Sequence, residues 1–336
     1  MIQKRNSLFV FLLAFFTACS SDKLNIDTSK IKLDIDYINL DSILVQSSDS
    51  ELLNYHYNLQ NKIDEIYDYQ IGYCLQIGEV QDSVFIRSIN LFKSDSGIFQ
   101  LEEDIRSKFQ DLTVYKEQIT SGFKHLNYYF ADGKLPRNIV FMNSLFQSNA
   151  FSTHNEIGVG LERYLGYTNR IVQKLPPETF YDWMKKGWEE EYLVRDVLCS
   201  WIMTHFIEEQ DNSLVESMIQ WGKILYLTEA ALPDSDKRII LRYTAQQYEW
   251  ADKNELLFWK YLVKEKMLFK NSGLEKANFL NEGPYTVGLP ENSPDRMGQF
   301  IGWKMVRNFM NKKGFKIEDL PKIPYNQILQ EYKIND

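Results

Sequence analysis

The order of apolar and polar residues divides the chain into three parts. Residues 31–45, "IKLDIDYINLDSILV", alternate between apolar and polar side chains, which predicts an edge strand. From 50 to 130 the apolar residues recur every three or four positions, which predicts a series of amphipathic helices. Two short apolar runs follow, "NIVFMNSLF" (138–146) and "IGVGL" (157–161), each preceded by turn residues. We therefore expect a small sheet at about 137–166, completed by the first segment.

The chain after Pro177 has helical spacing almost to its end. We interpret "AQQYEWADKNELLFWKYLVKEKMLF" as two helices that meet near Asp252, and "DRMGQFIGWKMVRNFMNKKG" as one helix that ends at Gly314. The predicted fold class is α+β, predominantly α-helical with a small β sheet. We expect a single domain over 31–336, with a helical C-terminal part at 177–336.

The N-terminus, "MIQKRNSLFVFLLAFFTACSSDK", has the pattern of a lipoprotein signal. A basic pair precedes an apolar run from Leu8 to Phe16, which is too short to cross a membrane, because a spanning helix needs about 20 residues. We expect residues 1–18 to be a signal peptide cleaved after Ala18, and Cys19 to carry the lipid. Residues 19–30 then form a tether. The alternative is an ordinary signal peptide in which Cys19 is incidental.

The net charge and the cysteines of the chain limit which partners and which cross-links it can have. The chain has 38 basic and 46 acidic residues and a net charge of −8, which removal of the signal would lower by two more units. Such a protein is poorly suited to nucleic acid, and we expect none as a partner. Cys74 and Cys199 lie in apolar runs, and both a disulfide and two buried thiols are consistent with this. The chain contains neither of the glycine-rich nucleotide-binding motifs G-x-x-x-x-G-K-[ST] and G-x-G-x-x-G, and no G-x-S-x-G motif of a hydrolase. We therefore expect no cofactor.

Several aromatic-rich blocks resemble the gliding-motility lipoprotein family GldB. They are "FKHLNYYF", "IGVGLERYLG", "DVLCSWIMTHF", "MIQWGKILYLTEAALPD", "YTAQQYEWADKNELLFWKYLVKEKMLF" and "ENSPDRMGQFIGWKMVRNFM". The resemblance extends from about residue 31 to the C-terminus. It implies a periplasm-facing lipoprotein of the Bacteroidota-type cell envelope, whose partners are envelope proteins of the gliding machinery and its linked protein secretion system. The resemblance leaves open which membrane holds the anchor and whether the host glides.

That family is in turn distantly similar to gluzincin-type zinc peptidases, whose ligand helix carries H-E-x-x-H. In "WIMTHFIEEQ", His205 would take the first ligand position, Phe206 replaces the catalytic glutamate and Glu209 replaces the second histidine. Glu255, on a later helix, resembles the third ligand. Because phenylalanine cannot act as a base, about 10²–10⁴-fold of general-base catalysis is forfeited. We therefore expect a degenerate zincin-like architecture and no enzyme activity.

The functional prediction is a non-catalytic lipoprotein that supports assembly or stability of the gliding and secretion machinery. The alternative is a metal-dependent hydrolase or peptide-binding module that uses His205, Glu209 and Glu255. A third possibility is a lipoprotein that binds a glycan. Gly298 and Gly302, four residues apart and followed by Trp303, form a smooth helical strip. This strip suits either close internal packing or a groove for a partner.

Overall fold

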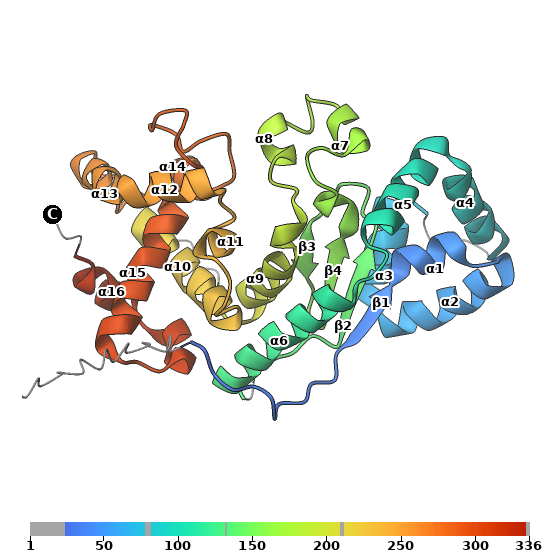
Figure 1. The fold of residues 1–336 in the computed structure, drawn as a ribbon, viewed down its shortest axis with the longest axis horizontal. Helices are drawn as coiled ribbons and strands as arrows, with labels where there is room; N and C mark the ends of the chain where they lie inside the picture. The colour runs from blue at the N-terminus through green and yellow to red at the C-terminus, as the bar shows by residue number, and fades with distance from the viewer. Residues whose placement is uncertain (1–23, 78–81, 132, 209–211, 334–336) are drawn as a thin grey trace, which may run out of the picture.

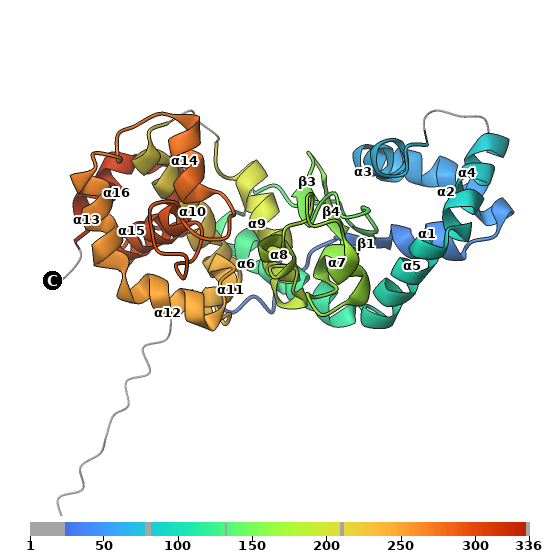
Figure 2. The same cartoon turned by 90° about the horizontal axis from the view of Figure 1, so that it is seen from above.

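The computed structural model describes residues 24–77, 82–131, 133–208 and 212–333. A four-stranded sheet occupies the middle of the molecule, with helices α1–α5 towards one end and α10–α16 towards the other (Figures 1 and 2). The strands are β1 (Asp36–Asn39), β2 (Asn138–Met142), β3 (Ala150–Ser152) and β4 (Glu156–Gly160). The predicted class, mostly helical with a small sheet, is confirmed.

Helix α1 (Leu40–Gln46) lies in the segment predicted as a strand, whereas the helices after it agree with the predicted helical region at 50–130. They are α2 (Asp49–Lys62), α3 (Asp64–Asp68), α4 (Asp82–Ser94), α5 (Ser96–Lys108) and α6 (Thr113–Tyr129), with a π-helical segment at Tyr69–Cys74. The helices after the sheet are α7 (Arg170–Lys174), α8 (Asp182–Lys185), α9 (Leu193–His205), α10 (Leu214–Ala231), α11 (Lys237–Leu241), α12 (Ala245–Lys253), α13 (Glu255–Lys264), α14 (Gly273–Leu280), α15 (Met297–Lys313) and α16 (Tyr325–Glu331). The expected division near Asp252 is confirmed, and α15 ends at Gly314 in the left-handed conformation.

The sheet has the order β1-β2-β4-β3, in which β1, β2 and β4 are parallel and β3 is antiparallel to β4. The segment at 31–45 does supply an edge strand, but the strand stops at Asn39. There the side chain of Asn39 accepts a hydrogen bond from Ser42 N and caps α1, so the next seven residues are helical. Leu161 likewise begins a short 3-10 helix rather than ending a strand.

Both faces of the sheet are covered, which explains the continuous apolar run of β2. Ile139 and Phe141 belong to the large core that includes α6, α9, α10 and α15. Val140 and Met142 belong to a second core with α1–α4. Parallel strands between two helical layers are buried on both faces, so their sequence does not alternate.

Leu24, within the expected tether, is also buried, and its carbonyl accepts a hydrogen bond from Tyr129 Oη at 3.2 Å.

Helices α10 and α15 are in direct backbone contact. A Cβ atom on Gly302 would lie only 1.7 Å from Met218 O, and one on Gly222 only 2.1 Å from Gly302 O. Gly298 faces another helix, since a Cβ there would lie 2.9 Å from Phe279 O in α14. The glycine strip identified in the sequence therefore lies against helices of the same chain.

A buried carboxylate joins the same helices next to this contact. Glu229 of α10 is fully buried and accepts a hydrogen bond from Trp303 Nε1 of α15 at 2.7 Å. It also pairs with Lys237 of α11 at 2.9 Å and Arg307 of α15 at 3.1 Å. A charge removed from water is stable only when it is paired and hydrogen-bonded, so Glu229 fixes the relative positions of three helices.

A second buried carboxylate lies within the sheet. Glu156 of β4 is 3% exposed, and its Oε1 accepts a hydrogen bond from Asn138 Nδ2 of β2 at 3.2 Å. Its Oε2 is buried without a hydrogen-bond partner in the described part of the chain. Burial raises the pKa of Glu156 to about 7. The sheet therefore contains a carboxyl group that favours its neutral form.

The contact between α10 and α15 predicts the effect of a single methyl group. Gly302→Ala should lower the free energy of unfolding by about 2 kcal/mol or more, because the helices must separate or distort. Gly273→Ala is the matched control, since its Cβ would meet no atom within 4 Å at the start of α14. Chemical denaturation of both variants measures the difference. Equal stability of the two variants would contradict the close contact.

The raised pKa of Glu156 predicts how stability depends on pH. The folded protein holds this proton more tightly than the unfolded chain, so the associated stability is present at low pH and is lost as pH rises through about 7. Glu156→Gln should therefore reduce the loss of unfolding free energy between about pH 5 and pH 8, and at pH 8 should stabilise the protein by about 1 kcal/mol or more. Denaturation across this pH range measures both. The exposed Glu117→Gln is the control, and a variant profile parallel to the native one would refute the assignment.

Candidate functional site

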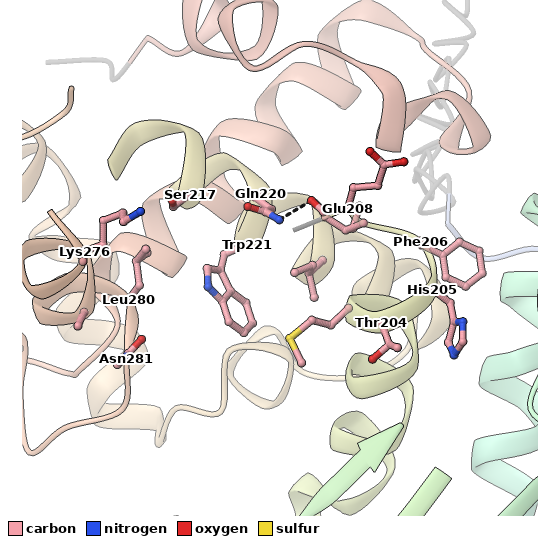
Figure 3. Close-up of a pocket in the computed structure, with 15 residues that line it drawn as sticks. Thr204, His205, Phe206, Glu208, Ser217, Gln220, Trp221, Lys276, Leu280 and Asn281 are labelled. Carbon is pink, nitrogen blue, oxygen red and sulfur yellow. Dashed lines mark hydrogen bonds between the residues drawn. The ribbon is translucent and has the colours of Figure 1, made fainter. Parts of the chain in front are cut away.

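A cleft of about 1200 Å³ opens where α9 ends. Its walls come from three helices and the segment after α9. In Figure 3, Thr204, His205 and Phe206 lie at one side of the cleft. Lys276 and Leu280 of α14, with Asn281 directly after it, lie at the other. Between them are Ser217, Gln220 and Trp221 of α10, and Gln220 Nε2 donates a hydrogen bond to Glu208 O at 2.7 Å. The cleft therefore contains the first of the proposed metal ligands.

The ring of His205 is bound to the protein itself. Its Nε2 lies 2.9 Å from Thr153 O, directly after the edge strand β3, and its ring centroid is 3.7 Å from that of Trp201. Because a carbonyl only accepts hydrogen bonds, we assign the proton to Nε2, which leaves Nδ1 as the acceptor. Burial lowers the pKa of His205 below its ordinary value, despite the bond to Thr153. The imidazole is therefore neutral at pH 7 and connects α9 to the sheet.

The neighbouring positions do not continue a ligand helix. Helix α9 ends at His205, and Phe206 is its C-cap residue. The Phe206 ring packs edge-on against Phe130, with centroids 4.7 Å apart, and in Figure 3 it points away from Lys276 across the cleft. A pair of ligands one turn apart needs an uninterrupted helix between them. Glu209, the second proposed ligand, lies outside the described residues.

Glu255, the third proposed ligand, is the first residue of α13 and does not line the cleft. Its Oε1 accepts a hydrogen bond from Tyr332 Oη at 2.8 Å, and its Oε2 lies 3.0 Å from Lys304 Nζ of α15. Glu255 thus joins α13 to the C-terminal segment. Across 24–77, 82–131, 133–208 and 212–333, no group of three or more His, Cys, Asp or Glu side chains is arranged to hold a metal ion.

The structure also shows the surroundings of the two cysteines and the tryptophan that the sequence singled out. Cys74 and Cys199 are both buried and free, so the disulfide alternative is wrong. They belong to the two separate cores on opposite faces of the sheet. Burial raises the pKa of the Cys74 thiol to about 11, which disfavours the reactive thiolate. Trp303 is 1% exposed, with its indole nitrogen bonded to Glu229. Cys19 lies outside the described residues.

The sequence did not identify a group of polar residues at the carboxyl ends of the three parallel strands. Asp41 follows β1, Asn143 and Ser144 follow β2, and Glu162 follows β4. Glu162 is fully buried and accepts hydrogen bonds from Ser144 Oγ at 2.5 Å and Phe146 N at 2.8 Å. These bonds tie the segments after β2 and β4 together. The carboxyl edge of parallel strands is a common place for polar sites, but the parallel pairing had to be known first.

Asp41 meets one further carboxyl group, that of Glu102, beside this edge. Glu102 of α5 is 6% exposed and accepts a hydrogen bond from Asn143 Nδ2 at 2.6 Å. Burial, together with the nearby Glu102, raises the pKa of Asp41 well above its ordinary value, and burial also raises the pKa of Glu102. Asp41 and Glu102 line a pocket of about 520 Å³ with Arg106. Both carboxyl groups therefore retain a proton to higher pH than an exposed carboxyl group does.

Comparison with known proteins gives one match. The family model of the gliding motility protein GldB matches residues 21–335. No curated protein and no solved structure matches the chain, so the zincin-like part of the predicted architecture stays a prediction. Among the described residues, no helix has the length and apolar character needed to cross a membrane.

The match covers nearly the whole chain, including every aromatic-rich block on which the resemblance was based. The chain therefore belongs to the GldB family of gliding motility lipoproteins.

Proposed function

We propose that this chain is a non-catalytic lipoprotein of the cell envelope, anchored through a lipid on Cys19 and facing the periplasm. It supports assembly or stability of the gliding machinery and its linked secretion system by binding envelope proteins of that machinery. Membership of a gliding motility family supports the cellular role. An anchor confines the domain to a membrane surface, which raises its effective concentration near other membrane-bound components.

The observation that carries the non-catalytic role is Phe206, which stands beside His205 where the base of a zinc peptidase would be and has no proton to transfer. Glu255, the proposed third ligand, is instead paired with Lys304 and Tyr332. The bond from His205 Nε2 to Thr153 O fits either role, because a ligating histidine also has its other ring nitrogen held by a second group. Phe206 and the pairing of Glu255 therefore favour a histidine that positions α9 over one that serves catalysis.

The cleft beside α9 supports the protein-binding role. Its volume of about 1200 Å³ exceeds the usual range for small ligands, which is about 300–1,000 Å³. Met203 is 44% exposed at its edge, and the half-buried Trp221 lies in its wall. Methionine and tryptophan are both enriched at protein interfaces. A polypeptide segment of a partner is the occupant that this size and lining suit.

The proposal predicts the outcome of site-specific cross-linking in cells. A photoreactive amino acid at Ser217, in the cleft, should capture a component of the gliding or secretion machinery. The same amino acid at Arg87, an exposed position on α4 at the other end of the molecule, should not capture that component. Mass spectrometry of the products identifies the captured proteins. Capture of no such component at Ser217, or of the same one at both positions, would count against a cleft-bound partner.

Metal analysis separates the proposed function from the metal-dependent alternative. If His205 has only a structural role, the purified lipoprotein should contain well under one zinc ion per chain, and His205→Ala should leave its metal content unchanged. Elemental analysis of native and variant protein measures this, with Trp201→Phe as a packing control that retains the histidine. One zinc per native chain that is lost in His205→Ala would replace the present proposal with the metal-dependent one.

A further inference from the structure

A third pocket lies apart from the cleft beside α9 and from the pocket at Asp41 and Glu102. It has a volume of about 550 Å³ and is formed by α8 and the turn after it, by α12, and by the loop between α14 and α15. Figure 1 shows α8 and α12 in the upper part of the molecule, with α11 between and below them. The volume is within the range of about 300–1,000 Å³ that small ligands occupy in proteins. Neither the proposed metal ligands His205 and Glu255 nor the strip at Gly298, Gly302 and Trp303 lines this pocket.

Two arginines with unusual backbone conformations form part of its lining. Arg242 and Arg296 have φ angles of 54° and 53°, in the left-handed region that residues other than glycine rarely adopt. Each such residue costs of order 1 kcal/mol or more and persists only where its surroundings fix it. Here Arg242 Nη2 donates a hydrogen bond to Gly187 O at 2.7 Å, and Arg296 Nη2 donates to Arg242 O at 3.2 Å. The two guanidinium groups are therefore held in place.

The lining carries an excess of positive charge. Among the described lining residues, Lys186, Arg242 and Arg296 are cationic, whereas Glu282 and Asp295 are acidic. Arg242 Nη1 lies 3.2 Å from Glu282 Oε1, and Arg296 Nε lies 3.0 Å from Asp295 Oδ2. Lys186 is exposed and adds the remaining positive charge. In a chain with a net charge of −8, a pocket with this balance favours a ligand that bears a negative charge.

One acceptor in the lining lacks a donor. Asp295 is 6% exposed, and its Oδ2 accepts a hydrogen bond from Gly283 N at 3.1 Å. Its other oxygen, Oδ1, is buried and has no hydrogen-bond partner in the described part of the chain. An unpaired buried carboxylate oxygen costs about 1–3 kcal/mol or more. A hydroxyl group of a ligand would supply the missing donor, whereas an anion without a proton, such as sulfate, would not.

The rest of the lining suits a ring with hydroxyl groups. Trp183 and Trp250 are half-buried, so each presents part of a flat indole surface. Close to them in the lining are the exposed Thr244 and Gln246 and the half-buried Gln247. Hydroxyl and amide groups both donate and accept, as hydroxyl-rich ligands require. Flat apolar surfaces, neutral polar groups and one excess cation together match a sugar ring that carries a carboxylate.

We propose that this pocket binds an acidic saccharide, with a sugar ring against Trp250, a hydroxyl group donating to Asp295 and the carboxylate near Lys186. This site lies apart from the cleft assigned to protein partners, and it adds attachment to a glycan to the proposed lipid anchor. It does not depend on the protein-binding role, so either function can fail without the other.

The test uses full-length protein purified in detergent and an array of oligosaccharides that contain hexuronic or sialic acids, each beside its carboxyl-methyl ester. The native protein should bind at least one acidic oligosaccharide, and calorimetry with that compound should show saturable binding that is weaker for its ester. Trp250→Ala should weaken binding about tenfold or more. Lys186→Gln should weaken binding of the acid up to about fivefold and leave binding of the ester unchanged.

The controls separate ligand binding from folding. Trp221→Ala removes a half-buried tryptophan from the cleft beside α9 and should leave saccharide binding unchanged. Lys186 is exposed, so Lys186→Gln is informative even where circular dichroism shows that Trp250→Ala disturbs the fold. The proposal is overturned when no acidic oligosaccharide on the array binds. It is also overturned when binding occurs but Lys186→Gln leaves the preference for the acid over its ester unchanged.

Discussion

The backbone contact between Gly222 and Gly302 determines the distance between α10 and α15. The cleft beside α9 and the pocket lined by Arg242 and Arg296 both depend on that distance. Shortly before Gly222, Ser217 and Gln220 of α10 line the cleft. Arg296 directly precedes α15, and Arg242 directly follows α11, which is joined to α10 through Glu229 and Lys237. The hydrogen bond from Arg296 to Arg242 O therefore forms only while these helices stay together.

Ionisable groups in this protein occupy interior positions that apolar residues fill in other proteins. Glu229 is fully buried and contacts three donors, and Glu162 is fully buried and accepts bonds from the segment after β2. Paired or hydrogen-bonded charges in a core confer little net stability, but removing one partner is costly. Their effect is to define which segments meet. The cost is visible where pairing is incomplete, as at Glu156 Oε2 and Asp295 Oδ1.

The H-E-x-x-H-like stretch shows that a histidine on a helix can either bind a metal ion or hold the helix in position. The sequence places a histidine before two acids, but whether it faces an open site depends on the contacts of its ring. Thr153 comes from the end of β3, some fifty residues earlier, and Trp201 lies one turn back on α9. Neither contact could be inferred from spacing. The same holds for Glu255, since its hydrogen-bond partner Tyr332 lies 77 residues further along the chain.

Local patterns were sufficient for the fold class, the order of most helices and the edge position of the first strand, but they left open whether Gly298 and Gly302 pack internally or form a groove. They were also sufficient for the family, because long aromatic-rich blocks are distinctive in combination. They missed the helix at Leu40–Gln46, where a side-chain cap at Asn39 ended the strand. They also did not bring together the lining of the pocket between α8 and α12, because Lys186, Arg242 and Asp295 are ordinary in their local contexts.

The sequence by itself therefore determined the helical and strand periodicities, the acidic balance, the N-terminal lipoprotein pattern and the family. Only the tertiary structure decided that three strands run parallel, that Cys74 and Cys199 lie in separate cores, and that Arg242 and Arg296 meet at one pocket. The physical reason is the separation along the chain over which each effect acts. Periodicity and capping act within a few residues, whereas burial, ion pairing and left-handed backbone positions depend on groups that approach only when distant segments pack together.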